Sequence, residues 1–160
     1  GSIRIFACHQ SSKHIVNSNV TNLLKREDGL GMNSMLYYQG YEEKVKKVKR
    51  SLLTTIIGVK EAGKSIAAYG AAAKGNTLLN YCGIGNEFID FAVDRSPHKQ
   101  GRYLPGTRIP VLDPDVIKNK KPDYVLILPW NLKKEIMSQT EFIREWNGKF
   151  IVPIPDTEIF

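Results

Sequence analysis

Residues 66–77 read IAAYGAAAKGNT, an apolar run followed at once by a turn of small residues. The run at 66–69 has the composition of a short buried strand, and the turn leads into a helix predicted over residues 76–81. A second uninterrupted apolar run lies at 124–128. Strands that are apolar on both faces are typical of parallel sheets that helices cover on both sides. These two runs therefore indicate an α/β fold.

Strands and helices alternate along the rest of the chain. Further strands are expected at 88–93, 108–112 and 150–154, and further helices at 114–120 and 132–146. This rhythm predicts a small doubly wound parallel sheet. In such a sheet, ligands bind at the carboxyl ends of the strands, where helix N-termini offer free N–H groups. The residues that follow each strand are therefore the candidate site.

The first third of the chain has a different pattern. Apolar residues recur every three or four positions over 35–62, which predicts one amphipathic helix of about 40 Å with its tyrosines in the core. Alternation at 3–8 predicts a strand, although no partner strand follows it, and a short helix is expected over 18–26. We therefore divide the chain into an appended strand and helix, 1–34, and an α/β domain, 35–160.

Composition narrows the class of protein. With 42% hydrophobic and 24% charged residues, no apolar run long enough to cross a membrane and no targeting segment, the chain is expected to be soluble and cytoplasmic. Much of the net charge of +7 lies near residues 44–50, where a solvated helix face is a simpler explanation than nucleic-acid binding. Cys8 and Cys82 lack the paired spacing of a zinc site, so two free thiols and no metal are expected. The chain begins without Met, and Gly1-Ser2 is either a cloning remnant or native sequence.

The turn after the first strand resembles two phosphate-binding fingerprints without meeting either. Against G-x-G-x-x-G it keeps Gly70 and Gly75 but has Ala72 at the second glycine, and against G-x-x-x-x-G-K-[ST] it has Asn76 in place of lysine. Small residues, the cation Lys74 and a helix expected to begin at Asn76 still form an anion cradle. A tight strand-to-helix turn that needs glycine for packing explains the same residues equally well.

Three further candidates stand directly after strands. Asp94 ends the second strand, where dinucleotide-binding folds carry an acid for ribose, and it equally well starts a turn. Trp130 and Asn131 follow the apolar run at 124–128 and lie at the same predicted edge. For Asn131, the favoured explanation is a helix cap.

The loop at 97–107 combines cations with an aromatic residue beside that edge, a content typical of ligand-binding loops. Lys99 and Arg102 have the charge to bind phosphate, and Tyr103 has a ring that stacks on a base or lines a sugar pocket. If an anion is the ligand, Lys74, Lys99 and Arg102 are expected to converge at the ends of the first and second strands.

Three stretches carry a resemblance to a known family: GAAAKGNTLLNYCG (70–83), VDRSPHKQGRYLPGT (93–107) and PDYVLILPWNL (122–132). They resemble the C-terminal, Rossmann-like domain of SAM-dependent sugar C-methyltransferases. Members of this family methylate a carbon next to a keto group in nucleotide-linked deoxysugars, often dTDP sugars. The resemblance implies an upstream zinc-binding segment and a SAM-binding methyltransferase domain, and it makes residues 1–8 the last strand of that domain.

The resemblance also implies a role for this chain. Carbon methylation needs a base, an enolate and a methyl sulfonium held in line with it, and the zinc cysteines, SAM-binding loop and catalytic His and Tyr that the family uses are not in this sequence. SAM is therefore expected in the upstream domain and no cofactor in this chain. The chain is expected to be inactive alone and to help bind the nucleotide-linked sugar through the candidates Gly70, Lys74, Gly75, Asn76, Asp94, Lys99, Arg102, Tyr103, Trp130 and Asn131.

Two other functions stay open. The first is an independent NAD(P)- or nucleotide-binding module with Gly70, Gly75 and Asp94 as its pyrophosphate and ribose contacts, against which Ala72 argues mildly. The second is a scaffold that binds nothing.

Overall fold

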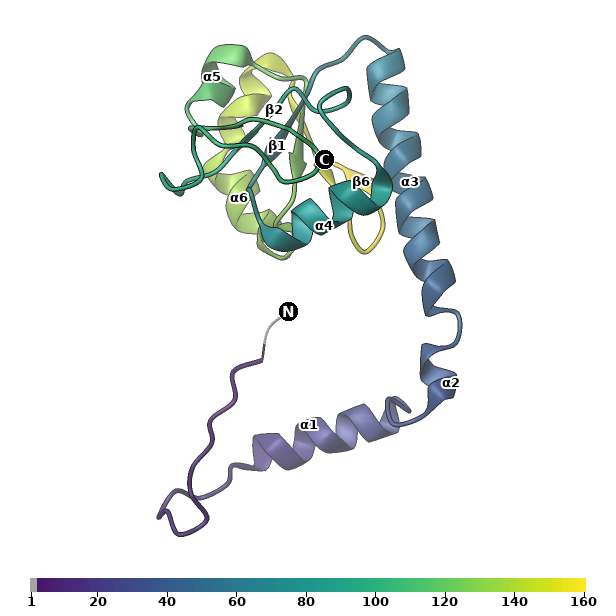
Figure 1. Ribbon diagram of the computed structural model, residues 1–160, viewed down its shortest axis with the longest axis vertical. Coiled ribbons are helices and arrows are strands. Elements are labelled where there is room, and N and C mark those ends of the chain that lie inside the picture. Colours follow the sequence, from purple (N-terminus) through teal and green to yellow (C-terminus); the bar gives the residue numbers. More distant parts are fainter. Residues whose placement is uncertain (1–2) are drawn as a thin grey trace. The chain divides into compact units, whose positions relative to one another are not determined.

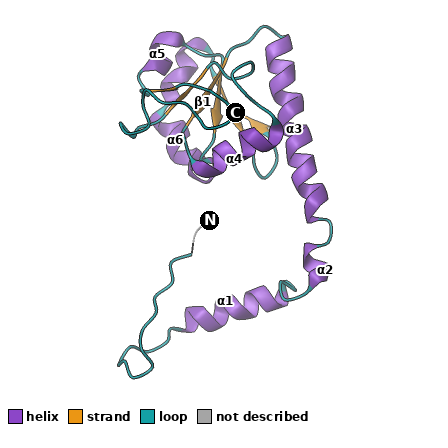
Figure 2. Cartoon of the chain, in the orientation of Figure 1, coloured by secondary structure: helices purple, strands orange, loops and turns teal. Residues whose placement is uncertain are grey.

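The structure, a computed structural model, describes residues 3–160 of the chain, so Gly1 and Ser2 lie outside the described residues. The chain divides into two compact units, Gly1–Lys44 and Val45–Phe160. The first consists of loops and helices, and the second holds the sheet (Figure 2).

The N-terminal unit contains α1 (Ser18–Gly29), close to the helix expected at 18–26. Its N-cap is Asn17, whose side-chain Oδ1 accepts a hydrogen bond from the backbone N–H of Asn19 at 2.8 Å. The strand expected at 3–8 is wrong, since residues 3–9 have no regular secondary structure. A strand needs a neighbour for its backbone hydrogen bonds, and within residues 3–160 no strand pairs with this segment.

The single helix expected over 35–62 is also wrong, because the chain forms α2 (Met35–Tyr38) and then α3 (Tyr41–Glu61). Gly40 has φ +78° between them, a left-handed conformation that interrupts an α-helix. Tyr37 and Tyr41, which were expected in the core, are 44% and 64% exposed.

The Val45–Phe160 unit is built on one six-stranded sheet in the order β3-β2-β1-β4-β5-β6. All neighbours are parallel except β5 and β6. The strands are β1 (Ile66–Tyr69), β2 (Phe91–Val93), β3 (Val111–Leu112), β4 (Tyr124–Ile127), β5 (Lys149–Val152) and β6 (Glu158–Ile159). The predicted α/β fold with a mostly parallel sheet is confirmed.

Helices cover both faces of the sheet, as the uninterrupted apolar strands predict. Buried residues of α3 and α4 (Ala73–Cys82) pack on one face, with Ile66 and Ala68 of β1. The other face packs on α5 (Val116–Lys120), α6 (Lys133–Gln139) and the 3-10 helix η2 (Glu141–Trp146), with Ala67 and Tyr69 of β1. Figure 1 shows α3 and α4 on one side and α5 and α6 on the other.

Two C-terminal expectations need correction. The helix expected at 132–146 is divided into η1 (Trp130–Leu132), α6 and η2. Thr140 lies at the second break, where its hydroxyl donates to the carbonyl of Ile136 at 2.6 Å and its backbone leaves the helical region. Strand β6 was not expected from the sequence, because it has only two residues and both are exposed.

The basic face of α3 is solvated, as the sequence predicts, since none of its basic residues is buried and the Lys47 side chain is 70% exposed. Lys47 forms an ion pair with Asp156 at 3.0 Å, and the Lys49 ammonium donates to the carbonyl of Tyr81 at 2.8 Å while lying 5.0 Å from the Tyr81 ring. These contacts fasten α3 to the loop before β6 and to α4. None of the helices within residues 3–160 is both long and apolar enough to cross a membrane.

Candidate functional site

The candidate site lies at the carboxyl edge of the sheet, beside its topological switch point. The chain runs outward from β1 to β2 and β3 and then returns to β4 on the other side of β1. Tyr69 is in register with Val93 of β2 and Ile127 of β4, so the three strands end at the same level. Ligands of open α/β sheets bind in the crevice at such a point.

Glycines allow the loops at this edge to approach one another closely. Gly70 has φ +92°, and a Cβ there would lie 2.5 Å from the Pro129 Cγ, in the loop after β4. A Cβ on Gly75 would lie 2.6 Å from the Cβ of Leu128. Both glycines thus have a packing role between the β1 and β4 loops, and their contact with a ligand stays a prediction.

Helix α4 begins at Ala73, three residues before the expected start, so Asn76 lies within its first turn. Ala72 occupies the N-cap and supplies no side-chain hydrogen bond. The first N–H groups of a helix have no partner within it, and they carry the positive end of its dipole. The side-chain Oδ1 of Asn76 is buried and has no hydrogen-bond partner within the described part of the chain.

Lys74, Trp130 and Asn131 come together beside this helix start. The Lys74 ammonium lies 4.6 Å from the centroid of the Trp130 ring and donates a hydrogen bond to the Asn131 Oδ1. The expectation that Asn131 caps a helix is wrong, because α6 begins at Lys133 with Leu132 at its N-cap and no side-chain cap bond. The sequence therefore predicted the residues of this cluster but not the bond between them.

Asp94 is a brace between the ends of β1 and β2. Its carboxylate accepts hydrogen bonds from the backbone N–H groups of Ala71 at 2.7 Å and Ser96 at 2.8 Å, and from the Lys99 ammonium at 3.1 Å. Burial acts to raise the pKa of this carboxyl, but these three donors outweigh it and the pKa is lowered. The Oδ2 atom accepts two of these bonds and the Oδ1 atom one, so most of the acceptor capacity of Asp94 is used within the loops, and its contact with a ribose stays a prediction.

The three cations that were expected to converge have different partners, and their convergence on an anion stays a prediction. Lys74 contacts the loop after β4, whereas Lys99 is paired with Asp94 at the end of β2. Within residues 3–160, the Arg102 side chain has no recorded hydrogen bond or ion pair, and Tyr103 is 67% exposed. The backbone of this loop is ordered by pairing along β3: Gly101 N–H donates to Val111 O, and Val111 N–H donates to Arg102 O, each at 2.8 Å.

The structure adds a cavity of about 390 Å³ at the same edge. Sequence reasoning missed its residues, because they come from five separate segments that only the fold assembles. Only two of them could have been found from the sequence, by their positions at strand ends: Tyr69 is the last residue of β1, and Arg95 follows β2. The lining includes Tyr69, Arg95, Gln100, Asp113, Asp115, Lys118, Thr140 and Phe142.

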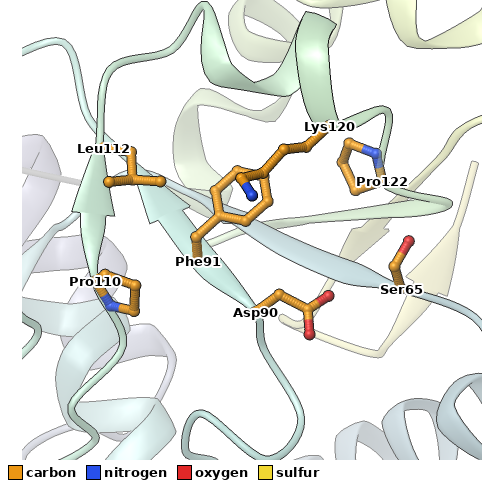
Figure 3. Close-up of a pocket in the computed structure, with 7 residues that line it drawn as sticks. All are labelled: Ser65, Asp90, Phe91, Pro110, Leu112, Lys120 and Pro122. Carbon is orange, nitrogen blue, oxygen red and sulfur yellow. The ribbon is translucent and has the colours of Figure 1, made fainter.

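A second cavity, of about 360 Å³, lies at the amino ends of the strands (Figure 3). Its polar groups already have partners: Asp90 is 3.6 Å from the Lys60 ammonium, and Lys120 lies over the Phe91 ring at 5.9 Å. The Ser65 hydroxyl donates to an Asp123 oxygen at 2.8 Å. This edge is not where open α/β sheets bind ligands, so we do not assign it as the site.

The described residues offer no evident place for a metal ion. Within residues 3–160, no three His, Cys, Asp or Glu side chains form a group that could hold one. Cys8 is exposed and Cys82 is buried, and both are free thiols.

The fold and the carboxyl-edge site together define a doubly wound α/β domain with a candidate anion-binding edge. The chain belongs to the family of C-methyltransferase C-terminal domains, which it matches over residues 1–155, and the resemblance stated from its sequence is confirmed. It is similar to the C-methyltransferase NovU of Streptomyces niveus, with 36% identity over 159 residues. The match covers 99% of this chain and 38% of that protein, so the chain spans under two-fifths of the relative's length.

Proposed function

We propose that this chain is the substrate-side domain of a SAM-dependent C-methyltransferase and helps to bind a nucleotide-linked keto-deoxysugar. The observation that carries the proposal is the cluster of Lys74, Trp130 and Asn131 beside the uncapped start of α4, at the switch point of the sheet. An ammonium and free helix N–H groups suit a diphosphate, and an indole ring suits a sugar or base. A cytoplasmic location belongs to the proposal, since SAM and nucleotide-linked sugars are intracellular metabolites.

The contacts of Asp94 argue against SAM binding by this chain. In a doubly wound site, the acid at the end of the second strand must accept the ribose hydroxyls, and here the oxygens of Asp94 are held by Ala71, Ser96 and Lys99. The same observation disfavours an NAD(P)-binding module. We therefore assign methyl transfer to a part of the parent protein outside this chain, with this chain inactive alone.

The exposed apolar residues of the N-terminal unit support the proposal that another domain of the parent protein packs against it. Helix α1 buries none of its residues, and Phe6, Ile15 and Val16 are each at least 75% exposed. Exposed apolar groups at this density are typical of a surface that packs against another part of a protein. We propose that residues 1–34 pack against the methyltransferase domain and complete it, and that residues 35–160 form the α/β part of the C-terminal domain, although the family match to the C-terminal domain begins at residue 1.

Thermal unfolding of the 160-residue chain tests the proposal. A dTDP-linked keto-deoxysugar at about 100 times its Kd adds about 2.7 kcal/mol to the unfolding free energy, a rise in Tm of roughly 5–10 °C for this size. SAM and NAD are expected to give no shift. A shift with NAD alone would favour the independent module, and no shift with any ligand would favour the scaffold.

A matched pair of lysine variants connects the binding to the proposed edge. Lys74→Gln removes the ammonium beside Trp130 and is expected to weaken binding of the dTDP sugar at least tenfold, because a charged hydrogen bond contributes about 1.5–3 kcal/mol. Lys47→Gln, on α3, removes an exposed ammonium paired with Asp156 and is expected to leave the affinity unchanged. Equal affinities for the two variants would exclude the α4 edge.

A further inference from the structure

Tyr69 is a buried polar side chain without a partner. It is the last residue of β1 and only 6% exposed, yet within the described residues its hydroxyl has no recorded hydrogen bond. The hydroxyl is not one of the fully buried polar atoms that lack a partner, so its oxygen is accessible to solvent. Since the Tyr69 side chain lines the 390 Å³ cavity at the carboxyl edge, the hydroxyl is available to a ligand in that cavity.

Arg95 lines the same cavity from the end of the neighbouring strand β2. Its guanidinium is exposed, and among residues 3–160 it has no recorded hydrogen bond or ion pair. Burial raises the pKa of the Tyr69 hydroxyl, and the charge of Arg95 acts in the opposite direction, as expected for close neighbours. The lining of the cavity therefore contains both a cation and a hydroxyl donor.

The other charged groups of the cavity are already satisfied. Asp113 accepts a hydrogen bond from the Gln100 Nε2 at 3.2 Å and another from the backbone N–H of Asp115 at 2.9 Å. The Asp115 carboxylate is paired with Lys118 at 3.3 Å. Within the described residues neither acid forms an ion pair with Arg95. Asp113 keeps its negative charge, because both of its donors are neutral, so Gln100 and Asp113 form a polar wall that suits hydroxyl groups rather than phosphate.

We propose that Arg95 and Tyr69 bind a phosphate group of the nucleotide-linked substrate, with its ribose or sugar hydroxyls toward Gln100 and Asp113. This inference rests on the proposed function and deepens it, because it adds to Lys74 and the start of α4 a second phosphate contact, at a pair that sequence reasoning did not select. A guanidinium presents two parallel donors to phosphate oxygens, and the phenol adds a third. The cavity volume lies in the range of small-molecule sites, about 300–1,000 Å³.

Calorimetric titration of the 160-residue chain with dTDP, and competition by inorganic pyrophosphate, test the assignment. Arg95→Gln is expected to weaken dTDP binding at least tenfold and to abolish the competition between dTDP and pyrophosphate. Tyr69→Phe removes only a hydroxyl and is expected to weaken dTDP binding about three- to tenfold. The matched controls are Arg108→Gln, before β3, and Tyr81→Phe, at the end of α4, both expected to stay within twofold. Since the Tyr69 hydroxyl has no hydrogen-bond partner among residues 3–160, Tyr69→Phe is expected to keep the parent Tm.

The outcomes separate this inference from the function on which it rests. If the parent chain binds dTDP and both Arg95→Gln and Tyr69→Phe bind it as tightly, the phosphate assignment is overturned and the proposed function stands. If the parent chain does not bind dTDP or a dTDP sugar at all, the proposed function fails and this inference with it.

Discussion

The Asp123 carboxylate joins the starts of β1 and β4, and its replacement by asparagine has an effect that the structure allows us to estimate. It accepts hydrogen bonds from the Ser65 backbone N–H at 2.9 Å, the Ser65 hydroxyl at 2.8 Å and the Lys64 ammonium at 3.0 Å. The hydrogen bond from the Ser65 backbone N–H has the largest effect on the pKa of this carboxyl. Together with Lys64 and the Ser65 hydroxyl it outweighs the effect of burial and lowers the pKa from 3.8 to about 2. A shift of that size corresponds to about 2.5 kcal/mol without screening. The side chain is 37% exposed, so we expect Asp123→Asn to lower the unfolding free energy by about 1–1.5 kcal/mol at pH 7.

The direction of the pH dependence follows from the lowered pKa. The folded chain keeps Asp123 ionised at a pH where the unfolded chain protonates it. Its contribution is therefore complete above the unfolded value of about 4 and is lost as pH falls toward 2. We expect the stability difference between the parent and Asp123→Asn to be constant from pH 7 to about 5 and to shrink between about 5 and 2.

Urea unfolding of the 160-residue chain at several pH values measures this difference from the midpoints and slopes. Asp156→Asn is the control, because Asp156 is 67% exposed in its pair with Lys47 and is expected to change stability by less than about 0.5 kcal/mol. Equal stability of the parent and Asp123→Asn at pH 7, or a deficit that does not change with pH, would refute the reasoning.

Three further predictions concern the candidate edge and the thiols. Gly70→Ala forces an L side chain into φ +92° with its Cβ 2.5 Å from the Pro129 Cγ, so we expect the unfolding free energy to fall by about 2–4 kcal/mol, measured as a fall in Tm. Gly101→Ala is the control, because Gly101 has φ +74° but open space around it, and it is expected to lose less stability. Similar losses for the two variants would contradict the close approach of Gly70 to Pro129. Arg102→Ala is expected to leave the Tm nearly unchanged. If the loop at 97–107 also contacts phosphate, calorimetry is expected to show that the variant binds the dTDP sugar about tenfold more weakly than the parent. An affinity equal to that of the parent would remove Arg102 from the site. Thiol titration of the denatured chain without reductant is expected to find both cysteines free, and finding neither free would mean that they are linked.

The architecture was predictable because burial on both sides of a strand leaves a direct mark on the sequence. The runs at 66–69 and 124–128 became the adjacent strands β1 and β4. Apolar periodicity predicted one helix over 35–62, because the repeat continues across Gly40. The left-handed backbone of Gly40 nevertheless divides that helix into α2 and α3. The strand expected at 3–8 failed for a related reason: alternation favours a strand, but only a partner supplies its hydrogen bonds.

The candidate site was predictable in its location and only partly in its contacts. Strand ends point to the carboxyl edge, so Lys74 and Trp130 were found from sequence position alone. The pairing of Lys99 with Asp94 could not be predicted, because the sequence does not show which charged side chains form ion pairs with one another. Tyr69 was hidden within an apolar strand, since a strand residue that lines a cavity and one that fills the core look the same in a sequence.

The loop that pairs along β3 has a consequence for the solubility of the protein. Open strand edges are templates for pairing with other chains, and they lead to aggregation. Here Gly101 and Arg102 bond to Val111 on one outer strand, while the opposite outer strand, β6, has only two residues. Removing the loop would uncover the β3 edge, so its shortening is expected to produce aggregates even where the core is untouched. The loop therefore protects the sheet from self-association whatever ligand it contacts.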